Sequence, residues 1–289
     1  MKYTILAPAK VNLYLDVLAK REDGYHEIES VMQSVSLCDK ISIDISKSSE
    51  LKISIDGTSD AIAWDEKNLA YKACKLFVSE AKITNSKIDI FVEKNIPISA
   101  GMAGGSTDAG GVLTLLNKAF GEPFSSEKLC ELGARLGADV PFCIVGGTYL
   151  CKGVGEVLLP LTPFKDKLLV CAIDSSSVST PVAYGMLDKK YGTDATSSSD
   201  INAFLAYVKN DDLNGVSSSL FNKFESVIIP ENPSILKIKD LLLENGALGA
   251  LMSGSGPSVF GLFGNETDQK RAFDALQNEK IQAFLCKTL

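Results

Sequence analysis

The chain has one histidine and one tryptophan among its 289 residues, and no cluster of lysine or arginine longer than a pair. A single histidine, His26, cannot build a two-histidine metal site, and Ser-His-Asp chemistry would rest on that one residue. Proton transfer is therefore expected to fall to aspartate, glutamate or lysine. With a net charge of −7, the lack of basic clusters argues against a nucleic acid or an anionic membrane as partner.

Paired cysteines and long apolar runs are also missing. The seven cysteines are scattered and form no CxxC pair, so neither a disulfide framework nor a zinc site is indicated. The N-terminal segment lacks the apolar core of a signal peptide, and no apolar run reaches membrane-spanning length. Hydrophobic residues nevertheless make up 45% of the chain, enough for one large globular domain or two modest ones. These features predict a cytoplasmic protein.

Hydrophobic periodicity predicts an α+β protein that opens with a sheet. Strands are expected at 3–6, 10–18, 29–37, 40–45 and 51–55, the last two as a hairpin, and then at 87–93, 168–173, 247–254 and 257–264. Helices are expected at 68–80, 106–119, 126–136, 233–244 and 267–277, with a loop at 196–200. The pattern favours a boundary between 155 and 170, which predicts domains of residues 1–160 and 161–289.

The glycine-rich stretch ISAGMAGGSTDAGG spans residues 98–111, between a predicted strand and a predicted helix. Glycine tolerates positive φ, which lets backbone N–H groups converge, and a helix start adds free N–H groups and a positive dipole end. Such a loop suits an anion, although a simple turn that caps the helix is the alternative. The lysine of the Walker pattern is missing, and no GxGxxG follows a strand, so a P-loop NTPase and a Rossmann dehydrogenase fit poorly.

Polar and apolar residues alternate over residues 10–17. This spacing places Lys10, Asn12, Tyr14 and Asp16 on one face of a strand. Alternation is typical of a half-exposed strand, so the strand alone favours a solvated surface. A catalytic role for Lys10 requires a partner elsewhere.

The candidate partner of Lys10 is Asp139, in the segment LGADVPF. An aspartate before Val-Pro is a good helix N-cap, and its carboxylate can simply accept backbone N–H bonds. A carboxylate at a helix start can also accept a hydroxyl proton in phosphoryl transfer. The two roles are compatible.

A second glycine-rich segment, Ser253-Gly254-Ser255-Gly256, lies between the last two predicted strands. On its own this segment is a hairpin turn, and a functional role is the less favoured interpretation.

Taken in order, these stretches resemble the GHMP kinases. The resemblance rests on the lysine-bearing strand, on PISAGMAGGSTDA at 97–109 and on SGSGPSVFG at 253–261. Further segments, APAKVNLYLDV, REDGYHEIESVMQSVSL, GADVPF and GGTYLCKGVGE, are similar to the members of that family that act on a cytidine-diphosphate-linked methylerythritol. The resemblance runs nearly from end to end.

The resemblance implies an α+β, two-domain GHMP kinase fold with ATP and substrate in an interdomain cleft. ATP would phosphorylate the free 2-hydroxyl of the cytidine-linked substrate, a step in the non-mevalonate isoprenoid route. Asp139 would accept the hydroxyl proton, and Lys10 would orient the hydroxyl and stabilise developing charge. The ATP phosphates would be bound by Pro97, Ile98, Ser99, Ala100, Gly101, Met102, Ala103, Gly104, Gly105, Ser106 and Thr107. Mg²⁺ is implied as well, with Ser106 or Thr107 nearest to it, and which of Ser106, Thr107 or Asp108 approaches the metal stays open.

The same resemblance implies the substrate contacts. Tyr25, His26 and Tyr184 would recognise the cytosine by stacking and hydrogen bonding, and Asn12 and Thr180 are further candidates. A turn at Tyr25-His26 and a core position for Tyr184 remain alternatives. The expected partner is this small molecule, with no nucleic acid and no membrane, and the expected state is a monomer or a weak homodimer.

One departure from the family pattern is Gly110-Gly111, where alanines are common. Two glycines inside a helix cost about 0.5–1 kcal/mol each relative to alanine, which predicts a more mobile helix start and weaker ATP binding.

Two other functions stay open on the sequence. A GHMP kinase for homoserine or mevalonate would leave the GYHEI segment and Tyr184 without a base to stack on. A GHMP-like decarboxylase or a non-catalytic nucleotide-binding module would bind nucleotide without kinase activity.

Overall fold

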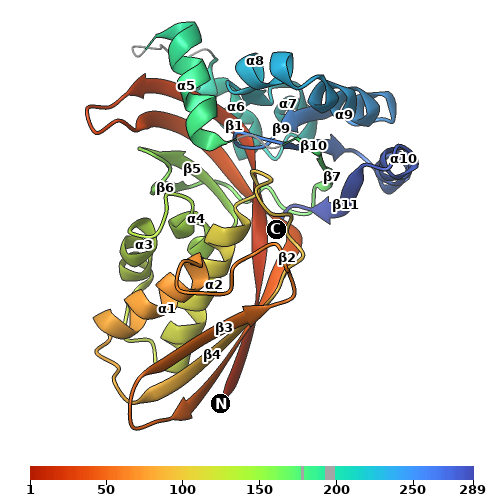
Figure 1. The fold of residues 1–289 in the computed structure, drawn as a ribbon. Helices are drawn as coiled ribbons and strands as arrows, with labels where there is room; N and C mark the ends of the chain where they lie inside the picture. The colour runs from red at the N-terminus through yellow and green to blue at the C-terminus, as the bar shows by residue number, and fades with distance from the viewer. Residues whose placement is uncertain (177–178, 193–198) are drawn as a thin grey trace. The chain divides into compact units, whose positions relative to one another are not determined.

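The computed structural model describes residues 1–176, 179–192 and 199–289 (Figure 1). The described chain forms two compact units. Unit 1 comprises Met1–Ala9, Leu37–Ile98 and Ala103–Gly146, and unit 2 comprises Lys10–Ser36, Ser99–Met102 and Gly147–Leu289. Strands β1 (Lys2–Lys20) and β2 (His26–Lys47) are long enough to contribute to both units. Each of them joins two strands that the sequence predicts as separate.

In unit 1, strand β4 (Ser86–Glu93) lies between β2 and β3 (Lys52–Gly57). It pairs antiparallel with β2 over Lys40–Lys47 and parallel with β3. The hairpin expected from residues 40–45 and 51–55 is therefore wrong. The chain reaches β4 from β3 through helix α1 (Leu69–Glu80), and a crossover of this kind permits parallel pairing.

The helices of unit 1 are α1, α2 (Gly104–Ala119), α3 (Ser126–Ala134) and α4 (Val140–Val145). Asn68 caps α1 by accepting the Ala70 N–H, and Ser125 caps α3. Helices α1 and α2 pack against each other (Figure 1). The core of unit 1 is formed by buried side chains of these helices and of the sheet, among them Ile41, Phe77, Ile90, Val112 and Leu116.

Close packing accounts for the two glycines of α2. A Cβ at Gly111 would clash with the Cδ1 atom of Ile41, and a Cβ at Gly110 would lie 3.2 Å from the Cys143 carbonyl carbon. Alanine at either position would push α2 away from the sheet or from α4, at a cost of about 1–3 kcal/mol for overpacking. The glycines therefore have a packing role that the sequence does not reveal, whatever their effect on mobility.

Unit 2 holds two groups of paired strands. β1 pairs with β8 (Phe221–Asn222), β2 pairs with β5 (Thr148–Lys152), and β5 pairs with β6 (Val157–Pro160). A second sheet has the order β11-β7-β10-β9. Its strands are β7 (Leu168–Ile173), β9 (Gly249–Met252), β10 (Ser258–Phe263) and β11 (Gln282–Lys287). The antiparallel pair β9–β10 confirms the predicted turn at 253–256.

The helical segments of unit 2 are α5 (Thr180–Tyr191), α6 (Ile201–Lys209), α7 (Leu213–Ser218), α8 (Glu225–Ile228), η1 (Ile229–Glu231), α9 (Pro233–Glu244) and α10 (Glu266–Asn278). The core of unit 2 includes Leu15, Val170, Phe224, Ile238 and Phe263. Most of the loop expected at 196–200 lies outside the described residues. Within the described ranges, no helix has both the length and the apolar character needed to cross a membrane.

Candidate active site

The predicted catalytic and phosphate-binding residues are distributed over both units. Asp139 belongs to unit 1 and Lys10 to unit 2. The glycine loop contributes Pro97, Ile98 and Ala103–Thr107 to unit 1 and Ser99–Met102 to unit 2. The substrate candidates Asn12, Tyr25, His26, Thr180 and Tyr184 all belong to unit 2.

Lys10 and Asn12 form a buried polar pair on β1. Their exposed fractions are 4% and 1%, and Tyr14 and Asp16 of the same face are buried as well. The solvated surface favoured by the alternation is therefore wrong: this face of β1 is covered. Lys10 Nζ donates to Asn12 Oδ1 at 2.6 Å, and Asn12 Nδ2 donates to Ser30 Oγ at 2.8 Å. An ammonium is expensive to bury, so this position favours a role beyond packing.

The turn at 253–256 packs on the central residues of the glycine loop. The Asn12 N–H donates to Ser253 Oγ, which donates to the Gly101 carbonyl, each at 3.2 Å. A Cβ at Gly101 would clash with the Ser253 carbonyl oxygen, and Gly101 has φ 73°. Glycine is therefore required at Gly101 both by space and by backbone conformation. The turn therefore does more than connect β9 to β10, because it packs against Gly101 of the glycine loop.

The backbone of the glycine loop has left-handed φ values at Ser99 (55°), Gly101 (73°) and Ala103 (61°). Helix α2 begins at Gly104, two residues before the predicted start at Ser106, and in the described structure its N-cap residue Ala103 makes no side-chain cap hydrogen bond. The first N–H groups of α2 thus receive no capping side chain from Ala103. A helix start of this kind is suited to an anion.

Thr107 lies inside α2, and its side chain is buried. Its hydroxyl lies 3.0 Å from the Pro8 carbonyl oxygen, to which it donates, and 3.3 Å from Cys143 Sγ. The Thr107 N–H donates to the Ala103 carbonyl oxygen at 2.8 Å. In this structure the Thr107 side chain therefore supports the packing of α2 in unit 1. The partly exposed Ser106 lies one residue closer to the helix start.

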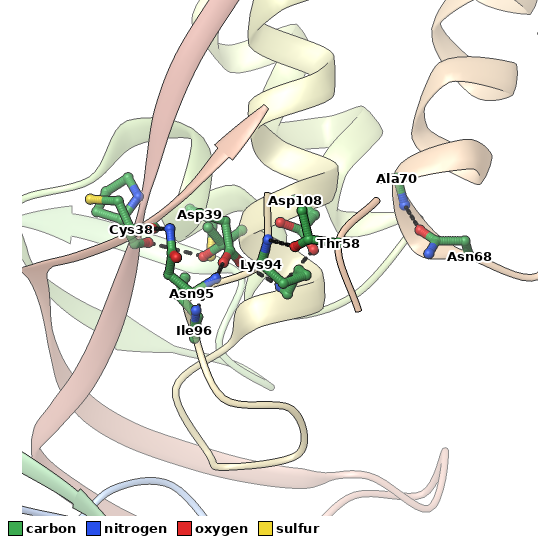
Figure 2. Close-up of polar contacts among 12 residues, drawn as sticks. Cys38, Asp39, Thr58, Asn68, Ala70, Lys94, Asn95, Ile96 and Asp108 are labelled. Atoms are coloured by element: carbon green, nitrogen blue, oxygen red, sulfur yellow. Dashed lines mark hydrogen bonds and ion pairs between the residues drawn. The ribbon is translucent and has the colours of Figure 1, made fainter. Parts of the chain in front are cut away.

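A buried charge cluster under the start of α2 was missed by the sequence reasoning (Figure 2). The Lys94 ammonium pairs with the Asp39 carboxylate and donates to Asp108 Oδ2 at 2.8 Å. Asp39 Oδ1 also accepts the N–H groups of Asn95 (2.6 Å) and Ile96 (2.9 Å). The cluster ties the segment before the glycine loop to the helix that follows it. The only signal in the sequence is that Lys94 and Asp108 flank the loop.

The charges of this cluster do not balance, because two carboxylates share one ammonium. Burial raises the pKa of Asp108 to about 7, with Asp39 adding to the increase and Lys94 opposing it. Asp108 Oδ1 is buried and accepts no hydrogen bond from the described residues. Both observations indicate that ionised Asp108 is costly in the folded protein.

This raised pKa predicts a specific dependence of stability on pH. The folded protein holds the Asp108 proton up to about pH 7, whereas the unfolded chain releases it near the ordinary aspartate pKa of 3.8. The stability contributed by Asp108 is therefore fully present below pH 3.8 and is lost as the pH rises through about 7. Asp108→Asn should remove this loss, which is at most about 1.4 kcal/mol per pH unit for one proton.

Urea unfolding at several pH values between 5 and 8 measures the effect. The control is Asp274→Asn, because Asp274 is an exposed carboxylate paired with Lys270 on α10. Equal pH slopes for the wild type and Asp108→Asn would contradict the assignment.

Asp139 occupies the N-cap position of α4, as the sequence predicts. Its backbone is in the right-handed helical region (φ −81°, ψ −14°), and within the described structure its side chain makes no cap hydrogen bond to α4. The expected role as a helix cap is thus not the one the carboxylate has here. Its side chain is partly exposed.

Two of the three aromatic substrate candidates in unit 2, His26 and Tyr184, contact each other. The rings of His26 and Tyr184 stack with centroids 4.5 Å apart and an interplanar angle of 17°. His26 Nε2 lies 2.6 Å from Asp188 Oδ1, and Lys20 binds the other oxygen of that carboxylate at 2.6 Å. Burial opposes ionisation of Asp188, but Lys20 and His26 outweigh it and hold the pKa of Asp188 below its usual value. Asp188, which orients His26, was missed from the sequence.

Tyr25 and Thr180 differ in their surroundings. The Tyr25 side chain is 65% exposed, so it has an open face for a ligand. Thr180 begins α5, and its hydroxyl lies 2.9 Å from the Ser255 hydroxyl. Thr180 is thereby linked to the 253–256 turn. Tyr184 also packs edge-on against Phe224 of the unit 2 core, which supports its core interpretation, and its role in ligand binding stays a prediction.

Comparisons with known proteins identify the family of the chain. The family description "GHMP kinases N terminal domain" matches residues 68–147, and "GHMP kinases C terminal" matches residues 201–282. The boundary near residue 160 falls between these ranges and stays a prediction. A 4-diphosphocytidyl-2-C-methyl-D-erythritol kinase of Clostridium perfringens (strain SM101 / Type A) is 44% identical over 277 residues, covering 94% of this chain and 93% of that protein.

Solved structures extend the comparison. A crystal structure of 4-(cytidine 5'-diphospho)-2C-methyl-D-erythritol kinase is 31% identical with a TM-score of 0.83, and 99% of each chain is covered. A homoserine kinase from Cytophaga hutchinsonii ATCC 33406 has a TM-score of 0.77 at 18% identity, covering 100% of this chain and 94% of the other. The second similarity concerns the fold alone. Because two family descriptions match and a relative is 44% identical over nearly its full length, the chain belongs to the GHMP kinase family of phosphotransferases.

Proposed function

We propose that this chain is an ATP-dependent kinase that phosphorylates the free 2-hydroxyl of 4-diphosphocytidyl-2-C-methyl-D-erythritol, a step in the non-mevalonate route to isoprenoid precursors. The observation that carries the proposal is the 44% identity, over 94% of the chain, to a kinase named for that substrate. The stacked rings of His26 and Tyr184 support the choice of substrate, because a kinase for a small alcohol without a base has no use for an aromatic pair.

Asp139 is the proposed general base, which accepts the proton of the attacking hydroxyl. A base in a kinase contributes by orienting the hydroxyl and taking its proton as the new O–P bond forms. Asp139 suits this role because it is a partly exposed carboxylate residue at the start of α4.

Lys10 is the proposed cation that orients the hydroxyl and stabilises the charge that develops during transfer. Its ammonium is fixed by Asn12 and lies beside the 253–256 turn, 3.7 Å from the position of a Cβ built at Gly254. A charge held in place by buried partners needs no reorganisation when the phosphoryl group arrives, and this is where electrostatic stabilisation is strongest.

The segment Pro97–Thr107 is the proposed site for the ATP phosphates. Left-handed residues in the loop and the uncapped start of α2 provide backbone N–H donors for phosphate oxygens. In this proposal Thr107 contributes through the position of its backbone in the first turns of α2, since its hydroxyl already donates to Pro8.

Mg²⁺ would supply positive charge that neutralises the phosphate oxygens of ATP. The described residues include no group of three or more histidine, cysteine, aspartate or glutamate side chains that could hold a metal. We propose that Mg²⁺ enters as MgATP, since magnesium is commonly bound by substrate phosphates together with one or two carboxylates.

Asn12, Tyr25, His26, Thr180 and Tyr184 are the proposed substrate contacts. The exposed Tyr25 ring can stack on the cytosine, and His26, oriented by Asp188, can hydrogen-bond the edge of the base. We also propose that the enzyme acts in the cytoplasm, without nucleic acid or membrane partners, as a monomer or a weak homodimer.

Release of ADP from MgATP tests the choice of substrate. The cytidine-diphosphate methylerythritol, homoserine and mevalonate are offered separately to the purified protein. Turnover of the cytidine substrate alone is the expected result. Turnover of homoserine or mevalonate instead would show that the chain is a GHMP kinase for that alcohol. Nucleotide binding without turnover of any of the three substrates would favour a non-catalytic nucleotide-binding module.

A further inference from the structure

The turn between β9 and β10 is held by a side chain that has no role in the function proposed above. Asn222 lies at the end of β8 and is 4% exposed. Its Nδ2 donates to the Met252 carbonyl oxygen at 2.7 Å and to the Gly254 carbonyl oxygen at 2.8 Å. Its Oδ1 accepts the Phe224 N–H at 3.0 Å. Both donors and the acceptor of this amide are used, so its orientation is fixed.

The bond from Asn222 to the Gly254 carbonyl decides which way the Ser255 N–H points. In a planar trans peptide, the C=O of one residue and the N–H of the next point in opposite directions. Because the Gly254 carbonyl points at Asn222, the Ser255 N–H points away from it. Neither the Gly254 N–H nor the Ser255 N–H donates to an acceptor within the described part of the chain. Gly254 has φ 58°, a conformation that glycine adopts without strain.

One ammonium and two hydroxyls lie near these N–H donors. Lys10 Nζ is 3.7 Å from the position of a Cβ built at Gly254, and the Ser255 hydroxyl is 2.9 Å from the Thr180 hydroxyl. Consecutive backbone N–H groups beside an ammonium and hydroxyls form an arrangement that suits the oxygens of a phosphate group.

We propose that Asn222 is a positioning residue, which holds the Ser253–Gly256 turn so that the Gly254 and Ser255 N–H groups bind a phosphate of a substrate beside Lys10. The inference rests on the function proposed above. The phosphate belongs either to ATP or to the diphosphate of the cytidine-linked substrate, and the shared chemistry is that of phosphate oxygens. Asn222 acts through the turn and contacts neither substrate in this account.

A second side chain keeps the hairpin folded without Asn222. Glu225 Oε1 accepts the Met252 N–H at 2.8 Å, and Lys239 binds the Glu225 carboxylate at 2.6 Å and 2.7 Å. Antiparallel pairing of β9 and β10 is also independent of Asn222. Loss of the Asn222 amide should therefore reorient the Gly254–Ser255 peptide and leave the hairpin in place.

Asn222→Asp tests the proposal with nearly no change in shape. A carboxylate cannot donate to the Met252 and Gly254 carbonyls, so at pH 8.5 kcat/KM should fall by about 10- to 100-fold. As the pH is lowered toward 6, the buried carboxyl should take up a proton and donate again, so the ratio of variant to wild-type activity should recover. The substrate whose KM rises identifies whose phosphate the turn binds. The control is Asn232→Asp, since Asn232 Nδ2 also donates to a backbone carbonyl, that of Ile228, at 2.9 Å.

Equilibrium binding separates failure of this inference from failure of the proposed function. Titrations of the wild type and of Asn222→Asp with ADP and with cytidine diphosphate need no turnover. Weaker binding of one nucleotide to Asn222→Asp, with Asn232→Asp unchanged and unfolding curves alike, would support the inference. Wild-type affinity for both nucleotides together with wild-type kcat/KM across the pH range would overturn it. A wild type that binds neither nucleotide would also overturn it, whereas binding without turnover would count against the proposed function alone.

Discussion

Asp139→Asn is expected to lower kcat by about 100- to 10,000-fold, because an amide cannot accept the proton of the attacking hydroxyl. The two side chains have nearly the same shape, and asparagine suits a helix N-cap position about as well as aspartate. The fold and the affinity for nucleotide should therefore be retained. Steady-state kinetics give kcat, and calorimetric titration with ADP gives the affinity.

Asp212→Asn is the matched control for this experiment. Asp212 is also an aspartate at a helix start, where its Oδ1 accepts the Gly215 N–H at 3.0 Å. Asparagine caps helices about as well as aspartate, so the control should keep both kcat and stability. If Asp139→Asn kept more than about a tenth of wild-type kcat, the assignment of Asp139 as general base would be wrong.

Lys10→Met should lower kcat by about 100- to 1,000-fold, the range found when one electrostatic donor is removed from a transition state. Methionine has a similar length and no charge, so it fills the buried position on β1. The loss includes an indirect part, because Lys10 Nζ holds the Asn12 side chain by the 2.6 Å bond to Oδ1. KM for the cytidine substrate should therefore rise as well.

Lys167→Met controls for the removal of a mostly buried lysine. The Lys167 side chain is 17% exposed and pairs with Asp211 at 2.7 Å. This control should lower stability slightly and leave kcat unchanged. Equal losses of kcat in Lys10→Met and Lys167→Met would show that the effect of Lys10 is only structural.

Helices and strands could be predicted from the sequence where the signals for them lie within the segment itself. The helix predicted at 233–244 agrees with α9, and the strand predicted at 168–173 agrees with β7. In both cases the periodicity and the end signals lie within the segment. The hairpin of β2 and β3 was wrong because strand pairing depends on residues far apart in sequence. Nothing between residues 40 and 55 indicates that β4 will lie between them.

Burial was the second point at which sequence reasoning failed. Alternation along β1 placed Lys10, Asn12, Tyr14 and Asp16 on one face correctly, but the covering of that face comes from other parts of unit 2, such as the 253–256 turn. The two-residue periodicity of a strand indicates which side chains share a face, but it does not indicate what packs against that face.

The supporting residues of the site were hidden for the same reason. Asp39, Lys94 and Asp108 are separated by 55 and 14 positions along the chain, and Asn222 is 30 and 32 positions from the carbonyls it binds. No local motif marks Asp39, Lys94 or Asn222, and the glycine-rich stretch that contains Asp108 does not indicate which residues Asp108 contacts. The residues named in advance were those in glycine-rich or family-like segments, whereas those that hold these segments in place became visible only in the structure.

Analysis of the reaction product tests the central claim most directly. The wild type is incubated with MgATP and the cytidine-diphosphate methylerythritol, and the product is examined by phosphorus NMR and mass spectrometry. The account predicts one new phosphomonoester on the 2-hydroxyl carbon, an intact diphosphate and one ADP for each product molecule. ADP released with no new phosphomonoester, or a phosphate on another oxygen of the substrate, would contradict it.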